Sequence, residues 1–214
     1  MEVITKFPLT NLELAELAEG QHFVRFPASL DEYWELLAEA EYRADYYDHE
    51  IIATMSYETD LHSHFAAEMG GILRQIFTDK KRFRLYNSNR PVYIEGCAGS
   101  ETGVFNPDGM VVALPSAKHE YRPGMDAETA PVFVLEVLSP STRHYDWGTK
   151  LPCYQQIPTL RQVVFMESDR PHLVVFERES PNRWTETVLT DADDSFHVEG
   201  QPVSLRAIYG DVYL

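Results

Sequence analysis

Two carboxylates in apolar surroundings are the residues of this chain most suited to chemistry. Asp108 follows Pro107 at the entrance to the apolar stretch 110–112, and Glu136 interrupts the strand-like run 131–138, which is hydrophobic on both alternating faces. An ionised carboxylate inside such a strand is costly to desolvate unless a partner compensates for it. A hard divalent cation is one such partner, because Mg²⁺ binds one or two carboxylates together with water and phosphate oxygens. If their strands are neighbours, the two acids predict a site for Mg²⁺ or Mn²⁺.

A lysine follows the second acid at a distance that a helix can bridge. The stretch after Ser139 begins with hydroxyl-bearing residues and leads into an expected helix over 142–156. Asp146 and Lys150 lie four residues apart and therefore share one face of that helix. A lysine there can orient a water molecule or stabilise negative charge on a transferred phosphoryl group. The backbone N–H groups after Ser139 can hold a phosphate.

Simpler explanations of the same residues remain open. Taken singly, Asp108 fits an ordinary turn, and Asp146 with Lys150 fits a surface ion pair worth about 0.3–0.5 kcal/mol. Glu136 is the hardest to explain by structure alone, because neither face of its strand suits water.

Capping signals and hydrophobic periodicity predict the elements that position these residues. Ser29-Leu30-Asp31-Glu32 is a capping box that opens a helix through about Ala40, and Asp48-His49 suggests a turn between two strands. The stretch 118–130 holds Pro, Gly and charges, so we expect an exposed loop there. The best helix spans 59–77, and strands are expected at 82–87, 91–95, 102–113, 131–138, 162–166, 173–178 and 184–190. This order predicts an α/β or α+β domain, in which at least two helices pack on a mixed sheet.

His62 falls on the core-facing side of the expected helix. At about 100° per residue, its side chain lies within the arc of Phe65 and Met69, whereas His64 faces water. A histidine that supports a catalytic site and a buried histidine bonded to a backbone carbonyl both fit this placement.

The charge distribution bears on nucleic-acid binding. The chain has a net charge of −16, which opposes non-specific affinity for nucleic acid because Lys and Arg supply that affinity. A local excess of basic residues between Arg74 and Arg90 nevertheless predicts candidate DNA contacts at Lys80, Lys81, Arg82 and Arg84. Solvated basic residues that complement a helix dipole are the alternative.

Composition also bears on location, redox state and domain organisation. No apolar run approaches the roughly 20 residues of a membrane helix, and Met1–Pro8 does not read as a signal peptide. We therefore expect a cytoplasmic protein with no membrane partner. Cys97 and Cys153 fit no metal-binding spacing and are predicted to be buried free thiols. Residues 1–25 are expected to form an N-terminal extension and residues 26–214 a single domain.

Several of these residues together resemble the Uma-two family of endonucleases, within the PD-(D/E)XK restriction-endonuclease-like superfamily. The resemblance runs from about Leu30 to the C-terminus, and it rests on Pro107-Asp108, Glu136-Val137-Leu138-Ser139-Pro140-Ser141-Thr142, Asp146, Lys150, Tyr154, Ile157-Pro158-Thr159-Leu160-Arg161, Asp169-Arg170-Pro171 and Val174 to Arg178. It implies a restriction-endonuclease-like mixed sheet flanked by helices, with an extra N-terminal hairpin and C-terminal strands. It further implies a Mg²⁺- or Mn²⁺-dependent endonuclease that acts on DNA. A homodimer is expected, because cutting both strands favours a two-fold pair of sites.

The resemblance also assigns roles to residues of this chain. Asp108 and Glu136 match the metal-binding acids, and His62 matches the family's usual histidine. The superfamily usually keeps its lysine two residues after the second acid, where this chain has Leu138, so Lys150 must reach back from the following helix. Four further residues are expected to support the site, namely Glu50, Ser139, Asp146 and Tyr154.

Two departures from the family pattern affect the expected geometry. The family's hairpin usually has Gly where this chain has His49, so the turn must form differently. Pro152 falls inside the expected helix and has no N–H for the carbonyl of Gly148, so we expect a local kink.

Two other functions are compatible with a pair of carboxylates. The net charge favours a catalytically silent binding or interaction module on the nuclease fold, because an acidic protein must find DNA against its own field. Glycoside hydrolysis by a carboxylate pair fits poorly, because nothing else in the chain indicates a sugar cleft.

Overall fold

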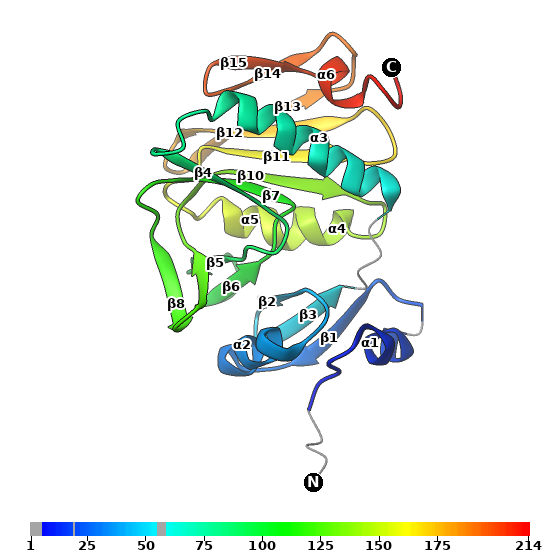
Figure 1. Cartoon of the computed structure of the whole chain (residues 1–214), viewed down its shortest axis with the longest axis vertical. Coiled ribbons are helices and arrows are strands. Elements are labelled where there is room, and N and C mark those ends of the chain that lie inside the picture. The colour runs from blue at the N-terminus through cyan, green and yellow to red at the C-terminus, as the bar shows by residue number, and fades with distance from the viewer. Residues whose placement is uncertain (1–5, 19, 55–58) are drawn as a thin grey trace.

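Two β-sheets with a helical segment between them dominate the computed structural model, which describes residues 6–18, 20–54 and 59–214 (Figure 1). The central sheet has six strands in the order β13-β12-β11-β10-β7-β4. Strands β10 and β11 pair in parallel, and the other neighbours are antiparallel. The bounds are β4 Phe83–Asn87, β7 Gly109–Ala113, β10 Pro131–Leu138, β11 Gln162–Glu167, β12 Leu173–Ser180 and β13 Arg183–Leu189. The mixed sheet predicted from the sequence is confirmed.

The second sheet has seven strands in the order β1-β3-β2-β6-β5-β9-β8. Their bounds are β1 Phe23–Pro27, β2 Ala44–Tyr47, β3 Glu50–Thr54, β5 Val92–Glu95, β6 Thr102–Phe105, β8 Lys118–Arg122 and β9 Met125–Glu128. Residues 1–5 and 19 of the expected extension 1–25 lie outside the described residues. The rest of that stretch contains helix α1 (Asn11–Ala18) and the start of β1, which pairs with β3.

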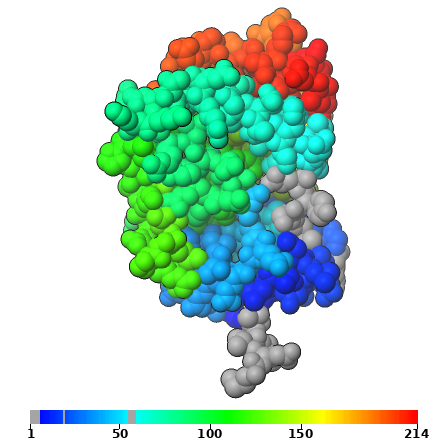
Figure 2. Space-filling view, viewed as in Figure 1, coloured from blue at the N-terminus to red at the C-terminus, as the bar shows by residue number. Residues whose placement is uncertain are grey.

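The N-terminal and C-terminal parts of the chain lie at opposite ends of the molecule (Figure 2). A C-terminal hairpin of β14 (Ser195–Val198) and β15 (Gln201–Ser204) and helix α6 (Leu205–Tyr209) pack on one face of the central sheet, near β12 and β13 (Figure 1). Among the described residues, no helix has the length and apolar character needed to cross a membrane.

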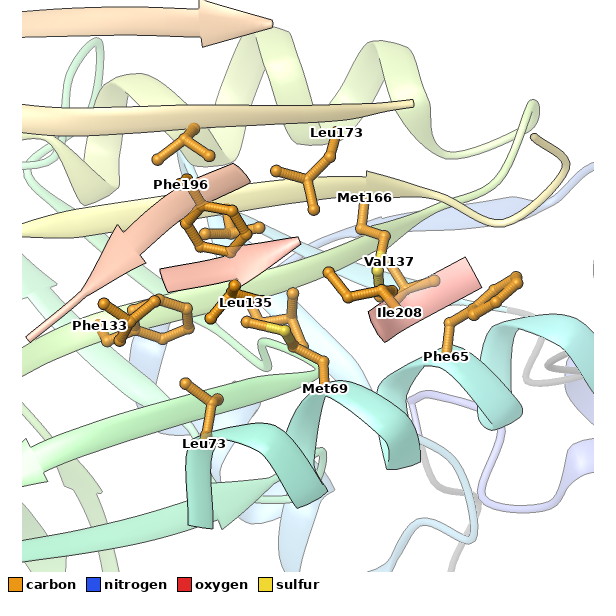
Figure 3. Close-up of a cluster of buried hydrophobic side chains, with 14 of the residues drawn as sticks. Phe65, Met69, Leu73, Phe133, Leu135, Val137, Met166, Leu173, Phe196 and Ile208 are labelled. Carbon is orange, nitrogen blue, oxygen red and sulfur yellow. The ribbon is translucent and has the colours of Figure 1, made fainter. Parts of the chain in front are cut away.

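Helix α3 (Asp60–Ile76) covers one face of the central sheet. Its side chains Phe65 and Met69 point toward the sheet, where alternate residues of β10, beginning with Phe133, meet them (Figure 3). Each such side chain contributes about 1.5–3 kcal/mol when fully buried. Because side chains alternate along a strand, Glu136 points to the other face.

Two helix starts form as the sequence predicts. Helix α2 (Leu30–Glu39) opens with the capping box, in which Ser29 Oγ accepts the N–H of Glu32 and the Glu32 carboxylate accepts the N–H of Ser29. Thr59 Oγ1 caps α3 by accepting the N–H of His62 at 3.2 Å. These bonds satisfy N–H groups that a helix start leaves unpaired.

The predicted turn at Asp48-His49 joins β2 to β3. Both residues have positive φ, 50° for Asp48 and 60° for His49, as a type I′ hairpin turn requires. His49 therefore adopts a conformation that glycine reaches more easily.

The single strand expected at 102–113 is instead two strands that belong to different sheets. Strand β6 ends at Phe105 in the second sheet, and β7 begins at Gly109 in the central sheet. Pro107 lies between them and has no N–H for either ladder. The chain therefore crosses from one sheet to the other at Asn106-Pro107-Asp108.

The exposed loop expected at 118–130 is wrong, because this stretch forms the β8–β9 hairpin at a sheet edge. Residues of β8 alternate between exposed and half-buried. His119 and Tyr121 stack on Trp34 of α2. This tertiary contact stabilises a strand that the local charge content does not reveal.

The helix expected at 142–156 changes its hydrogen bonding along its length. It consists of α4 (Arg143–Tyr145), a π-helical turn (Asp146–Lys150) and α5 (Leu151–Tyr154). Pro152 is the second residue after this turn. The helix is therefore irregular next to the proline where we expected a kink, and π-helical turns are frequent at functional sites.

The prediction of free thiols is wrong. Cys97, in the turn after β5, and Cys153, in α5, form a disulfide with their Cα atoms 4.6 Å apart. The two residues are 56 positions apart in sequence, and only the packing of α5 against the second sheet brings them together. Both are buried, as predicted.

Candidate active site

Asp108 lies at the junction of the two sheets and is held by the neighbouring strand. Its Oδ2 accepts the backbone N–H of Val137 at 2.7 Å. Strands β7 and β10 are antiparallel neighbours with Gly109 opposite Leu135. Asp108 therefore lies beside Glu136 on the neighbouring strand.

Glu136 points toward the helical segment 143–154. Its Oε1 accepts a hydrogen bond from the Tyr154 hydroxyl at 2.6 Å and another from Lys150 Nζ at 3.2 Å. The residue is 3% exposed. No described residue donates a hydrogen bond to its second oxygen, Oε2.

Lys150 reaches back from the helical segment to strand β10. Its ammonium lies 3.0 Å from Asp146 Oδ1, 3.2 Å from Glu136 Oε1 and 3.8 Å from Asp45 Oδ2. Lys150 and these three acids are all buried. The pair of Asp146 and Lys150 therefore belongs to a buried network and is not a surface ion pair.

His62 contacts the first acid directly. Its Nε2 lies 3.1 Å from Asp108 Oδ1, and both side chains are largely shielded from solvent. His62 stands in the first turn of α3, at the end of the helix nearest the two acids. His64 does not face water as expected, because it is half-buried and its Nε2 is inaccessible to solvent.

A cavity of about 220 Å³ joins these side chains. Besides the acids and Lys150, its lining includes three hydroxyl residues after β10 and several residues of the second sheet. Ser139 Oγ lies 2.8 Å from Ser141 Oγ and 3.0 Å from Thr142 Oγ1, so these hydroxyls form one hydrogen-bonded group. The cavity is therefore lined by acids, by basic side chains such as Arg43 and Lys150, and by neutral hydroxyl donors.

Burial and mutual repulsion set the ionisation of the acids. Burial raises the pKa of Glu136 well above its usual value, and the charges of Asp146 and Asp108 act in the same direction against Lys150. Burial also raises the pKa of Asp146, although Lys150 opposes it. Burial acts on Asp108 too, but the hydrogen bond and charge of His62, with the charge of Lys150, lower its pKa.

Lys150 is held in its charged form. Burial alone would lower the pKa of its ammonium, but Asp146, Glu136 and Asp45 together raise it well above the usual value. Three carboxylates around one ammonium leave an excess of negative charge, which a divalent cation would offset.

The donor set suits a small hard cation with few protein ligands. Within the described ranges, no group of three or more His, Cys, Asp or Glu side chains is placed to hold a metal ion. Mg²⁺ needs fewer, because it keeps several waters and takes one or two carboxylates. Asp108 and Oε2 of Glu136, to which no described residue donates a hydrogen bond, meet this requirement.

The structure brings most of the predicted residues together but leaves others apart. Ser139, Asp146 and Lys150 line the cavity, and Tyr154 reaches Glu136. Glu50 does not line it; its carboxylate pairs with Arg25 at 2.9 Å near the surface.

The basic residues Lys80, Lys81, Arg82 and Arg84 also lie away from the cavity. In the pairing of β4 with β7, Asn87 lies opposite Gly109, next to Asp108, whereas Arg84 lies opposite Val112. Arg84 therefore lies near the start of edge strand β4, roughly 10 Å or more from Asp108 at about 3.4 Å per residue, and Lys80, Lys81 and Arg82 lie in the turn that precedes the strand.

Sequence reasoning missed Asp45, a buried acid of β2 that lines the same cavity. The sequence signal that could have identified Asp45 is the same as for Glu136, namely a carboxylate inside an apolar strand. This signal is hard to detect for Asp45 because residues 31–50 hold eight acids, and no single one of them is distinguished by its neighbours.

The strand order, together with two acids and a lysine at the end of a parallel strand pair, defines a restriction-endonuclease-like fold. A family model named Uma2, described as "Putative restriction endonuclease", matches residues 30–207, and the chain belongs to this family.

Solved structures agree on the fold. A crystal structure described as a "putative nuclease belonging to DUF820" from Anabaena variabilis is 18% identical, with a TM-score of 0.66. The similarity covers 86% of this chain and 98% of that chain. Among curated proteins, no significant relative of this chain is found.

Proposed function

We propose that this protein is a divalent-metal-dependent endonuclease that hydrolyses phosphodiester bonds of DNA. The observation that carries the proposal is the convergence of Asp108, Glu136 and Lys150, from three separate elements, on one cavity. Membership of the Uma2 family supports it. The buried, strongly interacting acids also support it, because such groups cluster at functional sites.

Asp108 and Glu136 would hold Mg²⁺ or Mn²⁺, which when bound polarises a phosphoryl oxygen and lowers the pKa of a water molecule. His62 orients Asp108 through the contact at 3.1 Å. The N–H of Val137 holds the other oxygen of Asp108. Both contacts restrict the carboxylate before a ligand arrives.

Lys150 positions the attacking water beside Glu136. Asp146 anchors its ammonium from the same helical segment, and Tyr154 holds the facing oxygen of Glu136. The hydroxyls of Ser139 and Thr142 line the cavity and can donate to a phosphate oxygen.

We also propose that the protein works as a homodimer, with one site for each DNA strand. A cytoplasmic location is proposed from the sequence alone. The disulfide between Cys97 and Cys153 weighs against it, because reducing compartments keep most thiols free.

The proposal is tested by nicking of supercoiled plasmid DNA in chelator, Mg²⁺ and Mn²⁺. We expect cleavage by the wild type only with added metal, and none by Asp108→Ala. Lys150→Met should bind the metal but cut poorly. Equal inactivity of the wild type and Asp108→Ala across metals and DNA substrates would refute the catalytic claim.

A binding module without catalysis is the second candidate, and the net charge of −16 favours it. Calorimetry with Mn²⁺ separates the two candidates. A site that binds no Mn²⁺ at neutral pH supports the silent module.

A further inference from the structure

Asp45 is a buried carboxylate that the proposed chemistry does not yet use. It lies on β2 of the second sheet and is 5% exposed. Asp108 and Glu136, by contrast, are held by strands of the central sheet. Burying a charge far from water is costly unless its hydrogen bonds are fully supplied, so the partners of Asp45 indicate its task.

The two oxygens of Asp45 contact different parts of the site. Oδ1 accepts the backbone N–H of Asn106 at 2.8 Å and its side-chain amide at 3.2 Å. Oδ2 accepts the hydroxyl of Tyr145 at 3.1 Å and lies 3.8 Å from Lys150 Nζ. One carboxylate therefore joins β2, the turn that carries Asp108, and the helical segment that carries Lys150.

We propose that Asp45 is a positioning residue that sets the place of Lys150 over Glu136. A lysine side chain is long and flexible, and its ammonium is a point charge without a fixed direction. Here the ammonium has acids on three elements around it, with Asp146 on its own helix, Glu136 on β10 and Asp45 on β2. Contacts from three directions define one position for Nζ, and Asp45 is the acid of the second sheet that pairs with the ammonium among the described residues.

The same carboxylate steadies the turn before Asp108. Asn106 is two residues from Asp108, and its backbone N–H and side-chain amide both bind Asp45 Oδ1. This inference rests on the proposed nuclease function, and it assigns a catalytic purpose to the N-terminal hairpin of β2 and β3.

Asp45→Asn is the informative change, because it keeps the shape and an oxygen acceptor for Asn106 but removes the charge that faces Lys150. We expect kcat for DNA cleavage to fall about 10- to 100-fold, the range seen when a supporting polar partner is removed, with KM little changed. Tyr145→Phe is the matched control, since it removes a hydrogen bond from the same oxygen and leaves the charge; its effect on kcat should be several-fold smaller.

Two readouts separate positioning from a merely structural role or from metal ligation. In a Lys150→Met background, Asp45→Asn should cause no further loss of activity, because both changes remove the same interaction. Its Mn²⁺ affinity by calorimetry should equal that of the wild type. Multiplicative losses in the double variant, or loss of Mn²⁺ binding, would overturn the proposal.

The inference can fail independently of the proposed function. If the wild type cuts no DNA, urea unfolding of the single and double variants at Asp45 and Lys150 tests whether the two side chains interact. A midpoint shift in the double variant smaller than the sum of the single shifts supports the contact, and additive shifts overturn it. If Asp45→Asn does not fold, Asp45→Ser, which leaves room for a water, replaces it in the same cycle.

Discussion

Glu136 is held where its charge is disfavoured, and this has a consequence for stability. Burial raises its pKa well above the usual value of 4.5. The raised pKa means that the folded protein stabilises the neutral form of this carboxyl. As pH rises above 4.5 the carboxyl ionises more readily in the unfolded chain than in the fold, so the free energy of unfolding falls. The acid is therefore retained at a cost to the fold, as is common for groups that serve function.

Glu136→Gln tests this cost. The amide oxygen can still accept from Lys150 and Tyr154, and the charge is gone. We expect the free energy of unfolding at neutral pH to be unchanged or higher by about 1 kcal/mol, since a buried neutral group replaces a buried charge. Mn²⁺ binding and DNA cleavage should be lost.

The measurement is urea unfolding without metal over a range of pH. The difference in unfolding free energy between variant and wild type should grow in favour of the variant as pH rises. A large loss of stability at neutral pH would show instead that the ionised form of Glu136 stabilises the fold.

The residues of the site differ in how far the sequence could identify them. Asp108 and Glu136 stand in apolar stretches, so the cost of burying a charge marks them. Asp45 precedes two tyrosines in an acid-rich stretch, and its partners Tyr145 and Lys150 follow about a hundred positions later. Such contacts arise only when the two sheets meet, and no local pattern encodes them.

At the scale of elements, prediction succeeded where a signal was local. Helix α3 has a cap and a regular apolar face, and the β2–β3 turn is formed by two residues that tolerate positive φ. Prediction failed where a distant contact decides the structure. The hairpin at 118–130 depends on stacking against Trp34, and the split of 102–113 depends on which sheet each half joins.

The disulfide ties α5, which carries Tyr154, to the turn after β5. For the 56-residue separation of Cys97 and Cys153, loss of chain entropy in the unfolded state predicts a stabilisation of about 4 kcal/mol. We expect the double change of Cys97 and Cys153 to Ser to lower the free energy of unfolding by roughly that amount.

Urea unfolding with and without reductant measures this effect. Reductant should destabilise the wild type to the level of the double variant and should leave the variant unchanged. Equal stability of the oxidised wild type and the double variant would contradict the account.

The start of α2 should contribute to stability in a pH-dependent way. Hydrogen bonds from Lys6 and from the N–H of Ser29 lower the pKa of Glu32 to about 2. A lowered carboxyl pKa gives stability that is present above 4.5 and is lost as pH falls toward about 2. Glu32→Gln retains a cap acceptor but no charge, so its stability deficit should shrink over that interval.

Thermal unfolding of the wild type and Glu32→Gln at several acidic pH values checks this. A difference in midpoint that stays constant from neutral pH down to about 2 would contradict the assigned role of the charge.

At the scale of the whole molecule, an acidic protein must approach an acidic polymer. The net charge is −16. Arg84, near the start of β4, and Lys80, Lys81 and Arg82, in the turn before β4, lie away from the carboxylates. We propose that these residues contact the DNA backbone on one side of the cleaved bond, while the cavity takes the phosphate itself.

Replacing Lys80, Lys81, Arg82 and Arg84 with Ala should weaken DNA binding without changing Mn²⁺ affinity. The slope of log affinity against log salt should become shallower by about 0.9 for each phosphate of duplex DNA that the variant no longer neutralises. Fluorescence anisotropy over a salt series measures the slope. An unchanged slope would place the DNA-binding surface elsewhere.

The central claim is that Asp108 and Glu136 together hold a divalent cation that Lys150 faces. The most direct measurement is a crystal structure of the protein soaked in Mn²⁺, with the ion located by its anomalous signal. We predict one strong peak about 2 Å from a carboxylate oxygen of each acid, with the Lys150 ammonium within reach of a metal-bound water. A peak elsewhere, or no peak between these two acids at saturating Mn²⁺, would contradict the account.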